Sequence, residues 1–289
     1  MARERTDQEA QTQRELLAAL ALQLAWGADE ALDEAPCDRF RPASGLAPST
    51  APKPAPSEGA QRPPAPSVAV AAPFAAPLPG PVAEAQRLAA SAETLEALRE
   101  LFAGFEGCAL RETATNFVFA DGSPEAPVML VGEGPGAEED REGLPFVGPS
   151  GRLLDRMLAS IGIARRDGTI YITNVLPWRP PGNRSPTDGE IAVCLPFLKR
   201  HIALVKPKVL VLAGGVPARA LLGAREGITR LRGRWRMLEI PSLLEPIPTL
   251  PTLHPAYLLR NPGAKREAWS DLILLRRRLD TLLPQIGRN

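Results

Sequence analysis

Short continuous apolar runs alternate with helically spaced apolar residues over most of the chain. The runs have the length of buried strands and lie at 128–131, 170–173, 209–212 and around 249–253. Apolar residues three or four positions apart predict helices at 86–103, 151–161, 188–205, 217–222 and about 265–283. Strands that alternate with helices form a parallel sheet covered on both faces. The predicted fold class is therefore α/β, a three-layer α/β/α sandwich with a mostly parallel, four-stranded central sheet.

The first 84 residues lack this alternation and divide into two predicted segments. Leucines in residues 1–35 recur at helical spacing, which predicts a short helical segment suited to docking on a protein partner or on the main domain. Residues 36–84 are rich in proline and alanine, and such a stretch cannot bury enough apolar surface to offset chain entropy. We expect a disordered, proline-rich tether there, followed by a folded domain at 85–289.

Composition and charge limit the expected cellular location and the expected binding partners. The 289 residues contain no apolar run of about 18 residues and no basic-then-apolar opening, so neither a membrane partner nor a secretory signal is expected. The odd, scattered cysteines Cys37, Cys108 and Cys194 are typical of a reducing compartment, and the expected location is cytoplasmic. Residues 86–289 carry 27 Lys/Arg against 22 Asp/Glu, an excess that permits a polyanionic partner without requiring one.

The chain after the first predicted strand is rich in glycine and acids. Residues 132–136 read GEGPG, and the acids Glu138, Glu139 and Asp140 follow. A polar turn at the carboxyl end of a core strand is where open α/β sheets place their chemistry. The turn matches neither a dinucleotide-binding loop nor a P-loop, and on its own it is as often structural as functional. Phe146, between two glycines, is an aromatic that can stack on a planar ring or belong to the core.

Each predicted strand ends in polar or glycine residues that belong on the same edge of the sheet. The first strand is followed by Glu133, the second by Asn174, the third by two glycines and the fourth by His254. A carboxylate, an amide and an imidazole that converge at one edge predict an active site, although Asn174 as a turn cap and His254 as a loop histidine are alternatives. His201, in a charged stretch near a helix end, is expected to be solvated.

Three segments carry a resemblance to a known family. They read GEGPGAEEDREGLPFVGPSGRLLD at 132–155, YITNVLPWRPPGNRSP at 171–186 and HPA at 254–256. In this order and spacing they resemble the family 4 (type 4) uracil-DNA glycosylases, over roughly residues 100–280. The resemblance implies an enzyme of base excision repair that hydrolyses the N-glycosidic bond of uracil in DNA and leaves an abasic site. Its partner would be uracil-containing DNA.

The same resemblance assigns roles in a pocket for a flipped-out base. Gly132, Phe146 and Asn174 would bind the substrate, with Phe146 stacked on uracil and Asn174 paired to its Watson–Crick edge. His254 would donate to uracil O2 as negative charge develops there. Glu133, with Glu139 or Asp140 nearby, would position water or stabilise the sugar cation, and Glu133 is the first choice among these acids.

Two further segments are expected to contact DNA. The loop of Arg179, Asn183, Arg184 and Ser185 is stiffened by prolines and presents donors suited to phosphates, as would a generic surface loop. After His254, the residues Leu258, Leu259 and Arg260 are candidates for a wedge that fills the gap left by the flipped base. Either leucine is alternatively a core residue.

The chain departs from the resembled family at its metal ligands. Family 4 enzymes hold a 4Fe-4S cluster through four cysteines, but only Cys108 and Cys194 match, and Phe105 and Trp178 stand at the other two positions. Two thiolates cannot hold such a cluster in the usual four-cysteine manner. We therefore predict no metal and no cofactor, with the bulky Phe105 and Trp178 filling the vacated volume.

Two other functions compete with the uracil-DNA glycosylase. One is a catalytically altered nucleic-acid-binding or repair-recruitment module of the same fold, which would have less reason to keep Glu133, Phe146, Asn174 and His254 together. The other is a glycosylase for another damaged base, which residues around C5 and the exocyclic group would decide.

Overall fold

Six strands form one sheet, and the computed structural model describes them within residues 80–282. The order across the sheet is β1-β3-β2-β4-β6-β5. The strands are β1 Ala120–Gly122, β2 Val128–Gly132, β3 Ile170–Asn174, β4 Val209–Ala213, β5 Arg236–Leu238 and β6 Ile247–Thr252. The helical segment predicted at 1–35 and almost all of the predicted tether lie outside the described residues.

The four predicted strands are the four central ones, and they run parallel. The sheet is nevertheless mixed and six-stranded, because β1 and β5 pair antiparallel to β3 and β6 at its two edges. Each edge strand is three residues long and half-buried or mostly exposed, so neither has the apolar run that marks a buried strand. The predicted count of four strands is corrected to six for this reason.

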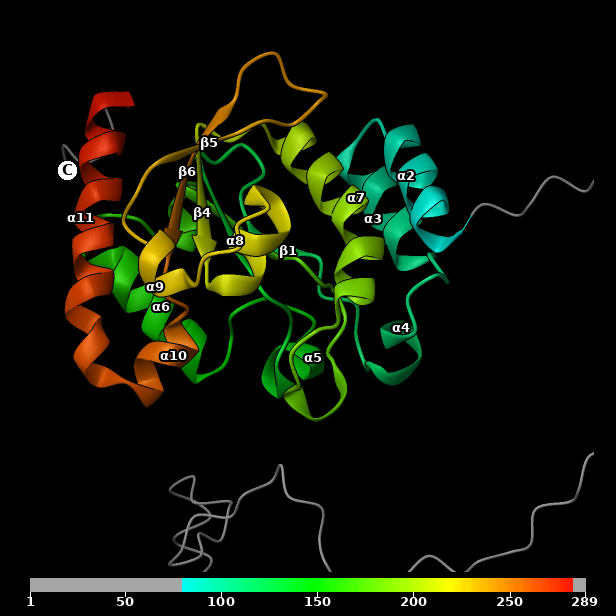
Figure 1. Ribbon diagram of the computed structural model, residues 1–289, viewed down its shortest axis with the longest axis horizontal. Helices are drawn as coiled ribbons and strands as arrows, with labels where there is room; N and C mark the ends of the chain where they lie inside the picture. The colour runs from blue at the N-terminus through cyan, green and yellow to red at the C-terminus, as the bar shows by residue number, and fades with distance from the viewer. Residues whose placement is uncertain (1–79, 283–289) are drawn as a thin grey trace, which may run out of the picture. The chain divides into compact units, whose positions relative to one another are not determined.

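Helices cover both faces of the sheet, which makes the three layers visible in Figure 1. Along β2, Met129 and Val131 face one helical layer, and Val128 and Leu130 face the other. The first layer contains α7 Asp188–Val205 and α8 Gly215–Leu222, with α2 Pro81–Ser91 and α3 Leu95–Ala103 packed against α7. The second contains α6 Pro149–Ala159 and α11 Lys265–Leu282.

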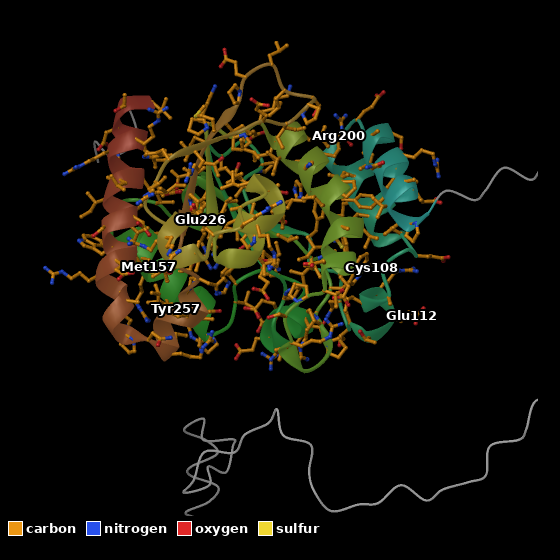
Figure 2. The ribbon with its side chains drawn as sticks, viewed as in Figure 1. Cys108, Glu112, Met157, Arg200, Glu226 and Tyr257 are labelled. Carbon is orange, nitrogen blue, oxygen red and sulfur yellow. The ribbon has the colours of Figure 1, made fainter. Side chains whose placement is uncertain are left out.

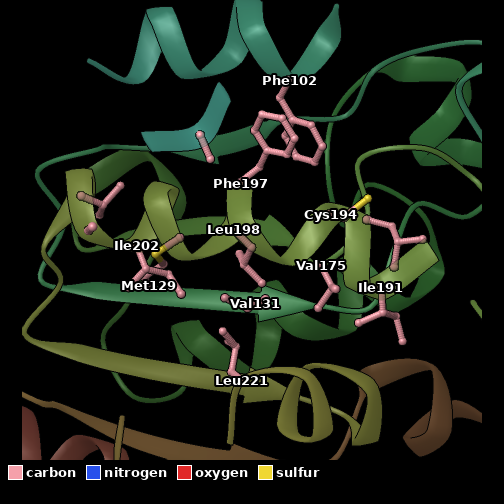
Figure 3. Close-up of a cluster of buried hydrophobic side chains, with 14 of the residues drawn as sticks. Phe102, Met129, Val131, Val175, Ile191, Cys194, Phe197, Leu198, Ile202 and Leu221 are labelled. Carbon is pink, nitrogen blue, oxygen red and sulfur yellow. The ribbon is translucent and has the colours of Figure 1, made fainter. Parts of the chain in front are cut away.

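Figure 3 shows the core between β2 and the first helical layer. Phe102 of α3 stacks on Phe197 of α7, with ring centroids 4.2 Å apart. Beneath them, Leu198 and Ile202 of α7 belong to the same buried cluster as Met129 of β2. This packing fixes α7 against the sheet. The segment 175–187 is therefore held at one end by β3 and at the other by α7.

The helices differ from the prediction mainly where they are short. The helix predicted at 86–103 is two helices, because Thr94 begins α3 by accepting a hydrogen bond from the Ala97 amide at 3.2 Å. Four short helices and three 3₁₀ turns were not predicted. The helices are α4 Leu110–Thr113, α5 Ala137–Glu142, α9 Ile228–Leu231 and α10 Pro255–Arg260. The turns are η1 Arg165–Asp167, η2 Pro181–Asn183 and η3 Pro262–Ala264. They are too short to show a helical period.

His201 of α7 is a correction of another kind. The sequence predicts a solvated residue, but the side chain is 3% exposed and its Nε2 lies 2.9 Å from the Tyr171 hydroxyl. Phe119 stacks on the imidazole at 4.4 Å. Burial lowers the pKa of His201 to about 3, so it is a neutral core residue. Among the described helices, none combines the length and hydrophobicity needed to cross a bilayer.

Candidate active site

A cavity of about 410 Å³ opens at the carboxyl ends of the parallel strands. Glu133 follows β2, Asn174 ends β3 and His254 comes two residues after β6, and all three line this cavity. The parallel register, in which Gly132 pairs with Asn174, brings the strand ends to one level. The structure therefore brings together the carboxylate, the amide and the imidazole that the sequence placed at one edge.

Asn174 supplies an open hydrogen-bond acceptor. The residue is 7% exposed, and its Oδ1 is buried without a hydrogen-bond partner among the described residues. A buried oxygen left unpaired costs about 1–3 kcal/mol, which a ligand that donates to it would recover. Gly132 does not line the cavity itself. A Cβ there would stand 2.3 Å from Asn174 Oδ1 and 2.7 Å from the Phe146 ring, so glycine makes room for both.

Phe146 forms an aromatic wall of the cavity. Its side chain is 5% exposed, and its ring lies 5.4 Å from the His254 ring with an interplanar angle of 29°. The backbone has a φ of 55°, in the left-handed region that a phenylalanine seldom adopts. The ring offers a flat apolar surface to a planar ligand.

His254 is set up as a neutral hydrogen-bond donor. It begins α10, where its Nδ1 accepts a hydrogen bond from the Ala256 amide at 3.1 Å. The proton of the neutral ring is then on Nε2. Burial and, to a smaller extent, the charge of Arg260 lower the pKa of His254 to about 4 against an opposing effect of Glu139, so the ring is uncharged at neutral pH.

Glu133 and Glu139 both line the cavity but have different surroundings. Burial raises the pKa of Glu133, and the charges of Arg219 and Arg260 oppose that rise in part. Glu139 is 8% exposed, and its carboxylate accepts hydrogen bonds from the amides of Gly136, Val147 and Gly148, each at 3.1 Å. Glu139 therefore joins two loops through its hydrogen bonds, whereas burial is the main influence on Glu133.

Asp140, predicted to share in catalysis, lies outside this cavity. Its Oδ1 accepts hydrogen bonds from the amides of Thr115 and Asn116, at 2.9 and 3.0 Å, and the residue is 4% exposed. A buried carboxylate paired to backbone amides is a structural group. The sequence could not show that Asp140 is buried, because α5 is too short for its helical period to indicate which acid faces the core.

The loop predicted to grip phosphates borders the cavity. Asn183, Arg184 and Ser185 are among its lining residues, and Arg179 Nε donates to Asn183 Oδ1 at 2.7 Å. Arg184 forms a two-pronged ion pair with Glu190 of α7, at 2.9 and 2.6 Å. This pair lowers the pKa of Glu190 to about 2 and anchors the loop to the start of α7.

The predicted wedge divides between core and surface. Leu258 is 1% exposed and packs in a small cluster with Leu153, Leu253 and Ala268, so its predicted contact with DNA is wrong. Leu259 is 42% exposed, and Arg260 lines the cavity. The helix α10 decides this outcome, because successive residues on a helix point in different directions.

The sequence missed several residues around the cavity. Ser150 and Leu176 line it, and the charge of Arg219 on α8 acts on Glu133. Ser150 lies in the resembled segment at 132–155, so its position was a usable signal. Arg219 carried none, because its proximity to Glu133 depends on how α8 packs against the sheet.

The four positions expected for a metal cluster do not form a ligand set. Cys108 and Cys194 are buried free cysteines whose thiols interact, and this interaction lowers the pKa of Cys108 and raises that of Cys194. Cys108 lies beside α7, which carries Cys194 (Figures 2 and 3). Phe105 and Trp178 are both buried in an aromatic cluster with Phe102 and Phe197. Within residues 80–282, no three His, Cys, Asp or Glu side chains gather to hold a metal.

A flat aromatic wall, an unpaired amide oxygen and a neutral imidazole donor at the edge of an open α/β sheet define a pocket for a planar heterocycle such as a nucleobase. The chain belongs to the uracil DNA glycosylase superfamily, whose model matches residues 119–273.

Several relatives named type-4 uracil-DNA glycosylase resemble the chain. The protein of Sulfurisphaera tokodaii is 38% identical over 181 residues, which are 60% of this chain and 80% of the relative. The protein of Pyrobaculum aerophilum is 37% identical over 184 residues, 62% and 92% of the two chains. The protein of Thermotoga maritima is 39% identical over 173 residues, 58% and 85%.

Proposed function

We propose that this protein is a uracil-DNA glycosylase that removes uracil from DNA by hydrolysis and leaves an abasic site for repair. Its relatives carry that name, and its domain belongs to that superfamily. The observation that carries the proposal is the unpaired Oδ1 of Asn174, buried in a cavity beside Phe146 and His254. That oxygen needs a donor, and uracil has one at N3.

Asn174 accounts for the choice of base. Its Oδ1 accepts from uracil N3–H while its amide nitrogen donates to O4, and Phe146 stacks on the ring. Cytosine has an acceptor at N3 and donors at the exocyclic amine, so it would leave both groups of Asn174 unpaired. A site built to hydrogen-bond one pattern rejects the other by about 10⁴-fold or more.

The reaction breaks the bond between the sugar C1′ and uracil N1. The electron pair of that bond leaves with uracil, and positive charge builds on the sugar. His254, neutral at neutral pH, donates through Nε2–H to uracil O2 and stabilises the departing anion. Glu133, as a carboxylate, orients a water for attack on C1′ and takes up its proton. The uracil anion then takes up a proton from solvent and Glu133 returns its proton to solvent, so the products are free uracil and an abasic deoxyribose.

We also propose that the protein works without an iron–sulfur cluster. Phe105 and Trp178 support this, because they stand at two of the four positions where the resembled family has cysteine ligands, and both are buried among aromatic side chains. Trp178 immediately precedes Arg179, so aromatic packing holds the start of the DNA-facing loop. Uracil-containing DNA is the proposed partner, with Arg179, Asn183, Arg184, Ser185, Leu259 and Arg260 as its contacts.

The test is release of uracil from a labelled oligonucleotide by the full-length protein. Matched oligonucleotides with cytosine or thymine at the same position are the substrate controls. His254→Ala and Asn174→Ala should each lose about 10²-fold or more in rate, because each removes a polar partner of the reacting base. Intact oligonucleotide in the presence of folded, DNA-bound wild type would reject the glycosylase and favour a binding module.

The same preparation tests the missing cluster. We expect a colourless protein, with no broad absorption near 400 nm, roughly where iron–sulfur charge transfer lies. Its uracil release should be unchanged by prolonged treatment with a strong iron chelator. A brown protein that bleaches and loses activity together would show that a cluster is present.

A further inference from the structure

The ring of Phe146 reaches the cavity from a backbone that needs outside support. A φ of 55° is uncommon for a bulky residue and persists where the surroundings hold the chain in place. The Phe146 carbonyl lies so close to α6 that a Cβ on Gly151 would stand 1.8 Å from its oxygen. The position of the ring is therefore set by the contacts of its own backbone.

Arg165 makes two side-chain contacts to this backbone. Its Nη2 donates to the Phe146 carbonyl at 2.6 Å, and its Nη1 donates to the Pro145 carbonyl at 2.9 Å. Arg165 is in η1, between α6 and β3, almost twenty residues beyond Phe146 in the chain. One guanidinium thus grips two successive carbonyls at the residue that walls the cavity.

Two carboxylates hold Arg165 in turn. Asp155 of α6 accepts from Nε at 2.7 Å, and Asp121 of β1 accepts from Nη1 at 2.9 Å. The Arg165 side chain is only 15% exposed. A planar guanidinium with donors on both edges can meet all four oxygens at once, whereas a lysine ammonium cannot.

We propose that Arg165 is a positioning residue for base recognition, acting through the backbone of Phe146. Asp121 and Asp155 orient the guanidinium, and the guanidinium fixes the aromatic wall on which the base stacks. The inference rests on the proposed function, because its consequence is measured as uracil recognition. Through Asp121, the three-residue strand β1 would also contribute to base recognition, although none of its residues lines the cavity.

The first test compares Arg165→Ala and Arg165→Lys with Arg166→Ala, whose exposed arginine stands next to it in η1. We expect kcat/KM for uracil release to fall about 10- to 100-fold in Arg165→Ala, the loss typical of a reacting group misplaced by about 1 Å. Arg165→Lys should fall between this and wild type, and Arg166→Ala should equal wild type. A second cavity of about 690 Å³ borders both Phe146 and Arg165, so added millimolar guanidinium should partly restore Arg165→Ala.

The second test separates recognition of the base from general loss of structure. Binding is measured to an oligonucleotide with 2′-fluoro-2′-deoxyuridine, which resists cleavage, and to one with a tetrahydrofuran abasic analogue, which has no base. Arg165→Ala should weaken the first by about the same factor as kcat/KM and leave the second unchanged. Equal weakening of both would overturn the proposal, since the base would then be irrelevant.

A double-variant cycle tests whether Arg165 acts through Phe146. If Arg165 acts only through Phe146, the variant Phe146→Ala/Arg165→Ala should be no slower than Phe146→Ala. Additive losses, or an Arg165→Ala enzyme as active as Arg166→Ala, would also overturn it. If Arg165→Ala fails to fold, Arg165→Lys and Asp155→Asn replace it in the measurements of uracil release and of oligonucleotide binding. A wild-type protein that releases no uracil would instead reject the proposed function. That outcome is distinct from a change in the rates of the variants relative to wild type.

Discussion

At the scale of single residues, two glutamates six positions apart have different surroundings. Glu133 and Glu139 flank one turn, and both line the cavity. Burial raises the pKa of Glu133, so its ionised form is disfavoured where it stands. Glu139 accepts three backbone hydrogen bonds, so its carboxylate is part of the loop structure. The sequence identifies both acids as candidates but does not distinguish them. Two of the amides that donate to Glu139 belong to a loop eight and nine residues further along the chain.

Glutamine substitutions should separate these roles. Glu139→Gln loses an acceptor and its charge, and the free energy of unfolding should fall by about 2 kcal/mol, as is usual for hydrogen bonds to charged groups. Glu133→Gln should leave stability equal or slightly higher while uracil release falls about 10²-fold or more. Urea denaturation and single-turnover kinetics on both variants measure this. Equal stability losses in the two variants would contradict the assignment.

At the scale of elements, the short helix α10 decides which residues of one segment are buried and which are exposed. Its sequence offers two adjacent leucines, and the apolar pattern cannot choose between them. The helix points Leu258 into a core shared with Leu153 and Ala268 and leaves Leu259 at the surface. The long helices and central strands could be predicted, because each has enough apolar residues to show its period. The short helices and edge strands could not.

Alanine at each leucine tests this division. Leu258→Ala should reduce the free energy of unfolding by about 2–5 kcal/mol, since it opens a cavity in a packed core. Leu259→Ala should leave stability within about 0.5 kcal/mol. If Leu259 fills the gap left by the base, its variant should slow uracil release from double-stranded DNA more than from single strands. The ratio of the two rates, compared with wild type, is the measurement, and an unchanged ratio would exclude the wedge.

At the scale of the whole molecule, burial of His201 couples folding to pH. The unfolded chain binds a proton at this residue below about pH 6.5, whereas the folded protein does so only near pH 3. The unfolded state therefore binds more protons between these limits, and stability must fall as the pH falls through that window.

The His201→Gln variant isolates this contribution. Because glutamine does not titrate, the free energy of unfolding of wild type relative to the variant should decrease steadily from about pH 6.5 towards pH 4. Above pH 7 the difference should be constant. Urea denaturation of both proteins across this range provides the values. A difference that does not change with pH would mean that His201 is protonated inside the fold.

The amino-acid sequence by itself determined the parallel α/β core and the convergence of Glu133, Asn174 and His254, because strand and helix periods and the residues that end each strand are local properties. It also located the departure from the family's cysteine ligands, at Phe105 and Trp178. Only the tertiary structure decided which acid is structural, which leucine is core and which arginine holds Phe146. These depend on contacts such as Arg165 with the Phe146 carbonyl and Asp140 with the Thr115 amide, which join segments far apart in the chain. Long-range packing leaves no periodic trace in the sequence, so no local pattern could reveal them.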